Sequence, residues 1–204
     1  WDDKLGQISL ATTTLFWGVS GNLRYLVLAW AGVALGFDTP HATLLLLLVG
    51  LGTAAGAVIA SVTVRLVHAT RVIMLGAALG ISVIAINGMH SVWVAGPFLI
   101  VLGAIGGFMV VPMNALLQHR GHNLMGSGRS IAVQNFNEQA AILGLGAFYS
   151  ALTRGGLSVF GSIAIFGIFV TCTSWLIWRW HRRNLVEHRA EVEGLLAIAR
   201  SDSH

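Results

Sequence analysis

The sequence predicts an all-α polytopic membrane protein with six transmembrane helices. Of its 204 residues, 55% are hydrophobic and only 10% are charged, and the mean hydropathy is +0.77. A soluble domain has about a quarter of its residues charged. Six apolar runs explain the difference, and each has the roughly 20 residues that cross a hydrocarbon core about 30 Å thick. They span residues 11–36, 42–64, 71–89, 92–118, 128–152 and 157–180.

Short polar connections rich in helix breakers separate the runs, as in FDTPH at 37–41 and QHRGHNLMGSGR at 118–129. The sequence therefore divides into three predicted parts. Residues 1–10 form a cytoplasmic linker, residues 11–180 form the six-helix transmembrane bundle, and residues 181–204 form an amphipathic cytoplasmic tail. In the tail, one helical face carries Leu185, Val192, Leu196 and Ala199.

The distribution of basic residues predicts the orientation of the bundle, because cytoplasmic loops are enriched in Lys and Arg. One side of the predicted membrane has only Arg154. The other side has Lys4, Arg65, Arg71, Arg120, Arg129, Arg179, Arg182 and Arg183. Both termini should therefore be cytoplasmic. These residues sit at the ends of apolar runs rather than on one soluble face, so nucleic acid is not a predicted partner.

Tryptophans are enriched at both membrane interfaces, where the amphipathic indole ring contacts both the hydrocarbon core and the hydrated headgroups. Trp30 and Trp93 lie at the predicted outer ends of their runs, and Trp175, Trp178 and Trp180 lie at the inner end of the last run. We expect all five to act as interface anchors.

Several catalytic classes are excluded by what the spans contain. Cys172 is the single cysteine, and no Cys/His spacing typical of a metal site occurs, so neither a metal site nor a cofactor is predicted. No histidine lies deep in a span, which excludes an intramembrane serine protease that needs a base beside its nucleophile. The GSGR at 126–129 lacks the Lys and Ser/Thr of a phosphate-binding loop. The sequence favours a transporter over an enzyme.

Only two charged residues, Arg24 and Glu138, lie well inside a predicted span. An ionisable residue within a membrane indicates a functional site, because it is costly unless it faces a cavity or a partner. Measured along helices from their cytoplasmic ends, Arg24 lies about 20 Å and Glu138 about 15 Å deep, a difference of about one turn. The two either pair directly or hold opposite ends of a zwitterionic ligand.

Polar residues follow both charges along helical stripes. Ser130, Gln134, Asn137, Glu138 and Ala141 share one face of the fifth span, and Thr13, Trp17, Ser20, Gly21 and Arg24 share one face of the first. A guanidinium suits phosphate because its planar fork donates two parallel hydrogen bonds. The alternative for Arg24 is a structural role. The amides either contact a ligand or bond one another across helices.

The fourth span contributes Asn114, two residues after Pro112, and the proline should kink the helix. The candidate substrate-binding residues are Trp17, Ser20, Arg24, Asn114, Gln134, Asn137 and Glu138. Asn22 lies on another face of its helix and is expected to bond a neighbouring helix.

Small residues mark the predicted packing faces, because they let helix backbones approach closely in a membrane. They are Gly50, Gly52 and Gly56 in the second span, Gly103, Gly106 and Gly107 in the fourth, and Gly144 and Gly146 in the fifth.

Three strings of the sequence resemble a known family. TTTLFWGVSGNLRYLVLAW at 12–30, GGFMVVPMNALLQHRG at 106–121 and GSGRSIAVQNFNEQAAILGLGAFYS at 126–150 are similar to the C-terminal half of the bacterial lysophospholipid transporter family within the major facilitator superfamily. The resemblance covers nearly all of residues 9–180. The loop at 65–71 lacks the superfamily's full Gly-x-x-x-Asp-Arg-x-Gly-Arg pattern.

The resemblance implies twelve helices in two halves, with this chain supplying helices seven to twelve and an N-terminal six-helix half as its partner. It also implies movement of lysophosphatidylethanolamine and lysophosphatidylglycerol to the inner leaflet of the bacterial inner membrane, where a separate or fused acyltransferase restores the missing chain. Arg24 would then bind the phosphate, Glu138 and the amides would bind the amine or glycerol, and apolar walls would hold the acyl chain.

Two other functions fit the same residues. One is a major facilitator exporter of drugs or other amphipathic small molecules that uses Glu138 as a proton or cation site. The other is a membrane assembly subunit whose tail recruits an acyltransferase.

Overall fold

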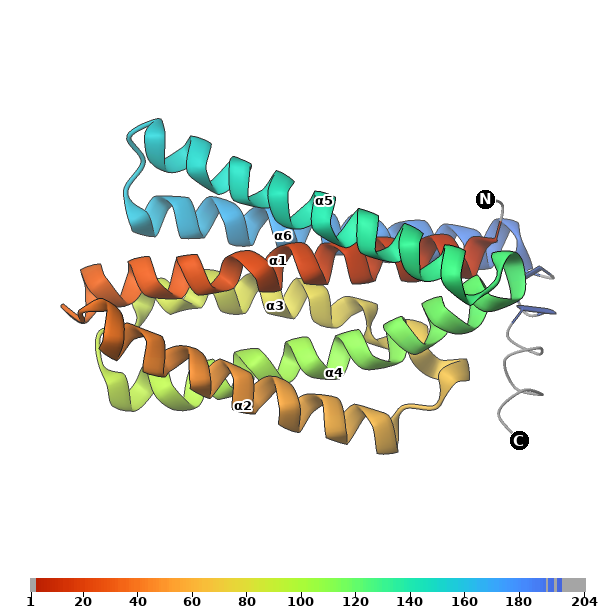
Figure 1. Ribbon diagram of the computed structural model, residues 1–204, viewed down its shortest axis with the longest axis horizontal. Coiled ribbons are helices and arrows are strands. Elements are labelled where there is room, and N and C mark those ends of the chain that lie inside the picture. The colour runs from red at the N-terminus through yellow and green to blue at the C-terminus, as the bar shows by residue number, and fades with distance from the viewer. Residues whose placement is uncertain (1–2, 190, 193, 196–204) are drawn as a thin grey trace.

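The chain folds into a bundle of long helices, shown in Figure 1. The computed structural model describes residues 3–189, 191–192 and 194–195. Within these residues there is no β-strand, which confirms the all-α class. The elements are α1 (Lys4–Ala34), α2 (Thr39–Thr63), η1 (Leu66–Met74), α3 (Leu75–Ala85), η2 (Ile86–Gly88), α4 (Val92–Met125), α5 (Ser127–Arg154) and α6 (Val159–Glu187).

The described part of the chain forms six long helical segments, and four of them are long and apolar enough to cross a membrane. They are α2, α4, α6 and the rod made of η1, α3 and η2, which together run over Leu66–Gly88. The other two rods, α1 and α5, are equally long but more polar. These are the helices that carry Arg24 and Glu138. The predicted polytopic membrane fold is confirmed.

Three helices, α1, α4 and α6, each extend seven residues beyond the runs predicted from hydropathy. Helix α1 begins at Lys4 rather than near residue 11, because Asp3 accepts a 2.5 Å hydrogen bond from the backbone N–H of Gly6 and caps the helix. Helix α4 continues to Met125, so the predicted loop at 118–129 is wrong. Only Gly126, with a φ of 80°, separates α4 from α5. A glycine is favoured at this left-handed backbone position.

Helix α6 also outruns its prediction and continues to Glu187. The first residues of the predicted tail at 181–204 therefore extend the last rod of the bundle. Val192, one of the four residues of the predicted apolar face, is fully buried. Leu196 and Ala199 lie outside the described residues.

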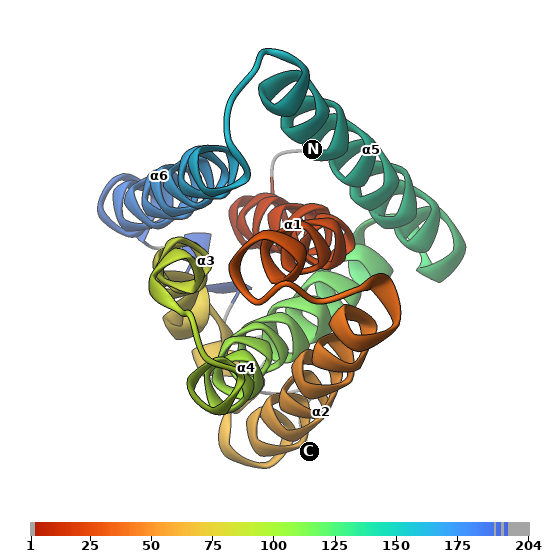
Figure 2. The same ribbon diagram turned by 90° about the vertical axis from the view of Figure 1, so that its left-hand side faces the viewer.

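Helix α1 occupies the middle of the bundle, as the end-on view in Figure 2 shows. It packs against α2, α4, α5 and α6. Trp30 near its end is completely buried in the hydrophobic core, so the expectation that it anchors an interface is wrong. Trp93 is 89% exposed at the first turn of α4 and is compatible with that role.

Helices α2 and α4 approach each other backbone to backbone. A Cβ added at Gly52 or Gly56 of α2 would overlap a main-chain carbonyl of α4, and one added at Gly103 or Gly107 would overlap a carbonyl of α2. The carbonyls belong to Val49, Thr53, Ile100 and Ala104. The two glycine pairs therefore interlock and confirm the predicted packing faces. Gly50 and Gly144, predicted in the same way, have open space beside them.

One end of the bundle is basic. Figure 1 shows the starts of α1 and α5 and the ends of α2, α4 and α6 at the same end. Because the helices alternate in direction, the basic residues predicted to share one side lie at this end, and we call it the basic end. Arg154 ends α5 at the opposite end, where Asp38 caps α2.

Candidate substrate-binding site

A hydrogen-bonded cluster joins α4 to α5. The side-chain amide of Gln134 donates one hydrogen bond to Asn114 Oδ1 and one to Glu138 Oε1, each 2.7 Å long. Gln134 and Glu138 are buried, with 7% and 9% of their surface exposed. The amide thus uses both of its protons to bridge the two helices. Of the two uses predicted for these amides, the structure contains the bond across helices.

The predicted polar face of α5 is largely confirmed. Ser130 is buried like Gln134 and Glu138, and Ala141 packs against Gly18 of α1. Asn137 is only partly buried, and its amide donates a 2.8 Å hydrogen bond to the carbonyl of Val133 in its own helix. Asn137 therefore lies at the edge of this face.

Arg24 is exposed on α1 and is held by its neighbour in sequence. Its Nη2 donates a 2.8 Å hydrogen bond to the hydroxyl of Tyr25, and the guanidinium lies 4.8 Å from the centre of the tyrosine ring. It forms no ion pair with Glu138. The direct pairing considered from the sequence is not present in this structure.

The packing of α1 against α5 explains why the two charges stay apart. Gly18 lies against Ala141 and Leu145, and Asn22 reaches Ile142. In this register Arg24 lies roughly nine residues beyond the level of Glu138, or about 14 Å at 1.5 Å per residue. The predicted difference of one turn is too small, because α1 begins at Lys4 and places Arg24 further from the basic end.

The stripe predicted on α1 is open over most of its length. Trp17, Ser20 and Arg24 are exposed and lie at helical spacing, so they form one accessible face. Thr13, expected to begin the stripe, is instead buried and donates its hydroxyl proton to the carbonyl of Ser9. Trp17 lies nearest to the level of Glu138, so the stripe connects the depth of Arg24 to the depth of the cluster.

Asn22 links α1 to α5, as expected. Its side-chain amide donates to the carbonyl of Gly18 at 2.8 Å and to the carbonyl of Ile142 at 3.0 Å. The residue is 2% exposed, and Gly146 leaves room for its carbonyl oxygen. This contact sets the register that separates Arg24 from Glu138.

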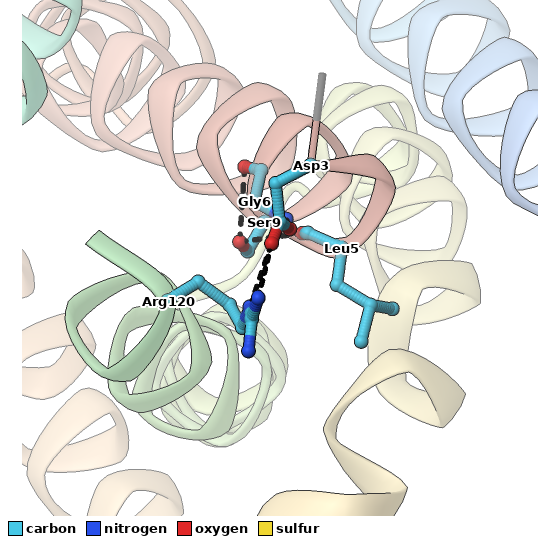
Figure 3. Close-up of polar contacts among 5 residues, drawn as sticks. All are labelled: Asp3, Leu5, Gly6, Ser9 and Arg120. Carbon is cyan, nitrogen blue, oxygen red and sulfur yellow. Dashed lines mark hydrogen bonds and ion pairs between the residues drawn. The ribbon is translucent and has the colours of Figure 1, made fainter. Parts of the chain in front are cut away.

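A buried ion pair near the basic end was not predicted from the sequence. Arg120 of α4 donates from Nε and Nη2 to the carboxylate of Asp3, as Figure 3 shows, and the Nε bond is 2.8 Å long. From the sequence, Asp3 falls in the predicted linker at 1–10 and Arg120 in the predicted connection at 118–129. The sequence signal that could have located the pair is the position of the two charges. Asp3 comes just before the first helix and Arg120 lies near the end of a helix that runs in the opposite direction, so both lie at the same end of the bundle.

An apolar groove of about 500 Å³ opens between α1, α5 and α6. Its walls include Leu15, Leu145, Phe148 and Phe169. The groove has the apolar lining that an acyl chain prefers. Among residues 3–189, 191–192 and 194–195, no three His, Cys, Asp or Glu side chains come together in a way that could hold a metal ion.

The chain is similar to proteins named lysophospholipid transporter LplT. It is 36% identical to the one from Photorhabdus laumondii over 185 residues, which is 89% of this chain and 46% of the relative. It is 37% identical to the one from Enterobacter sp. (strain 638) over 184 residues, which is 90% of this chain and 46% of the relative. The chain is a relative of these transporters.

The relative from Yersinia enterocolitica is 41% identical over 160 residues, 78% of this chain and 40% of its own length. The chain thus spans about half the length of the curated relatives it matches. No protein-family model and no solved structure matches it.

Proposed function

We propose that this chain forms one six-helix half of a lysophospholipid transporter of the major facilitator type. The observation that carries the proposal is its identity of 36–37% to proteins of that name over about nine tenths of its length. The second half would be an N-terminal bundle of six helices, and the two halves would enclose the substrate between them.

The substrate proposed from the resemblance is lysophosphatidylethanolamine or lysophosphatidylglycerol, delivered to the inner leaflet of the bacterial inner membrane. The basic end of the bundle would face the cytoplasm, because cytoplasmic ends of membrane proteins are rich in Lys and Arg. An acyltransferase, separate or fused, would then restore the second acyl chain.

Arg24 is the proposed phosphate-binding residue. Its guanidinium is exposed on α1, well inside a span predicted from the sequence, and it contacts the hydroxyl and the ring of Tyr25, neither of which carries a countercharge. A charge at this depth needs a polar partner or cavity. A phosphate supplies both the charge and two acceptor oxygens for the planar fork.

The cluster of Asn114, Gln134 and Glu138 is proposed to contact the amine or glycerol hydroxyls. Because it lies about 14 Å from Arg24 along the bundle axis, the two do not grip one headgroup at the same moment. Trp17 and Ser20 connect the two levels, so a headgroup would pass Arg24 and the cluster in succession. The groove beside Leu145 and Phe148 is proposed to accept the acyl chain.

Replacing Arg24 tests the proposal. In the full-length transporter, Arg24→Ala should lower lysolipid transport at least about tenfold, because a hydrogen bond to a charged group contributes about 1.5–3 kcal/mol. Transport by Arg24→Lys should lie between that of the unaltered protein and that of Arg24→Ala, because lysine keeps the charge but lacks the planar fork of the guanidinium. Membrane insertion, measured by cysteine accessibility, should be unchanged.

Arg129→Ala is the matched control, because Arg129 is an exposed arginine at the basic end rather than on the α1 stripe. It should leave transport close to that of the unaltered protein. Undiminished transport by Arg24→Ala would reject the role assigned to this arginine. Transport of a panel of substrates tests the exporter alternative. An exporter would carry compounds that lack a phosphate or an acyl chain at rates similar to those for lysolipids.

A further inference from the structure

A second pocket lies at the basic end, away from the α1 stripe and the amide cluster. It has a volume of about 360 Å³ and opens where the end of α2, the short helix η1 and the start of α3 meet the side of α4. Figure 1 draws the connection between α2 and α3 at the same end as the N-terminus. The pocket is lined by Thr63, Val64, His68, Arg71, Val72, Leu75 and Phe108.

Part of the lining of this pocket is polar and basic. His68 and Arg71 both belong to η1. They are three residues apart, which is one turn of a 3₁₀-helix, so their side chains lie on the same face. Neither side chain makes a hydrogen bond or ion pair with any residue in the described part of the chain. Arg71 is exposed and His68 is partly exposed. The two donors are therefore available to an anionic ligand.

The rest of the lining is largely apolar. It includes Phe108 of α4, Leu75 of α3 and Val72, which is 5% exposed. A soluble anion would gain nothing from these side chains, whereas an amphiphile would use both the basic and the apolar residues. The pocket lies where α2, a candidate membrane span, has just ended, which is the level of lipid headgroups.

We propose that this pocket binds the phosphate group of an anionic phospholipid, such as phosphatidylglycerol, in the leaflet at the basic end. Basic pockets between membrane helices bind anionic headgroups, and the bond from arginine to phosphate is strengthened by charge. Arg71 and His68 donate to the phosphate oxygens, and the first carbons of the acyl chains lie against Leu75 and Phe108. This inference is independent of the proposed transport function.

The test is a lipid titration of the full-length purified protein in detergent, read by native mass spectrometry. Phosphatidylglycerol should form a saturable complex, and Arg71→Gln should weaken its apparent affinity at least about tenfold, because a charged hydrogen bond of about 1.5–3 kcal/mol is lost. His68→Gln should weaken the affinity by a smaller factor. The thermal midpoint of each variant establishes that it is folded.

Arg65→Gln is the matched control. Arg65 is an exposed arginine six positions before Arg71 that does not line the pocket, so its loss should leave the affinity within about twofold. Equal weakening by Arg65→Gln and Arg71→Gln would overturn the proposal in favour of a general attraction to basic charge.

Two competitors identify the source of the phosphate. Inorganic phosphate at millimolar concentration should not displace the lipid. Phosphatidylethanolamine should bind more weakly than phosphatidylglycerol, because its ammonium group is repelled by the guanidinium of Arg71 and cannot accept a hydrogen bond from Arg71 or His68. If inorganic phosphate displaces the lipid, the site is one for soluble phosphate. If phosphatidylethanolamine binds equally well, the pocket does not select an anionic headgroup, and the proposal fails.

Discussion

Arg120 and Asp3 form an ion pair that joins the end of α4 to the first turn of α1. Their side chains are only 5% and 3% exposed, and the carboxylate of Asp3 also accepts the backbone N–H of Gly6 (Figure 3). One carboxylate thus caps α1 and binds α4 at once. Arg120 Nη1 is buried without a hydrogen-bond partner, so the contacts of the buried guanidinium are those of Nε and Nη2 with Asp3.

We predict that Arg120→Met destabilises the protein by about 3–5 kcal/mol, because removing one member of a buried ion pair leaves the other charge buried and unpaired. The measurement is the thermal unfolding midpoint of the full-length protein in detergent. Arg129→Met removes an exposed arginine nearby and should change the midpoint little. A double variant, Asp3→Leu with Arg120→Met, should recover part of the loss. An unchanged midpoint for Arg120→Met alone would mean that the pair contributes nothing.

The close contact between α2 and α4 predicts a different kind of loss. Gly56→Val should destabilise the protein by about 1–3 kcal/mol or prevent its folding, because the new side chain overlaps the carbonyl of Ala104 and forces the helices apart. Gly50→Val in the same helix meets open space and should be tolerated. Yield of monodisperse protein and thermal midpoint measure the difference. Similar behaviour of the two variants would contradict the packing described for α2 and α4.

Asn22→Ala should cost about 0.5–2 kcal/mol, the range for hydrogen bonds between membrane helices. The variant loses the bond from its amide to Ile142 that holds α5 on α1. Chemical denaturation in mixed micelles measures this change, with Asn135→Ala on the exposed side of α5 as the control. We expect the KM for lysolipid to stay the same, since Asn22 is buried away from the α1 stripe. A raised KM with unchanged stability would place Asn22 among the residues that contact substrate.

Glu138→Gln separates the two functions proposed for this carboxylate. The variant keeps a hydrogen-bonding partner for Gln134 and removes the charge. If Glu138 binds the amine, transport of lysophosphatidylethanolamine should fall about tenfold while transport of lysophosphatidylglycerol is retained. Equal loss for both substrates, together with a lost response to an imposed pH gradient, would instead support the proton or cation site of an exporter.

Composition and helical periodicity were enough to predict the fold class and the helices that carry polar residues. Apolar runs of span length, with charges confined to their ends, leave helices in a membrane as the simplest solution. The helical spacing of Ser130, Gln134 and Glu138 was enough to place them on one face, which is buried in the structure. The alternation of basic and neutral ends was enough to place the basic residues together.

The way in which these helices pack against one another could not be predicted from the sequence. Hydropathy could not detect that α1 begins at Lys4 or that α4 continues to Met125, because the extra turns are polar and are stabilised by the Asp3 cap and the Asp3–Arg120 pair. The register of α1 on α5 depends on Gly18 and Asn22 meeting particular residues of α5. The position of Arg24 relative to Glu138 along the bundle axis depends on such contacts between helices. The spacing of polar residues within one helix carries no information about them.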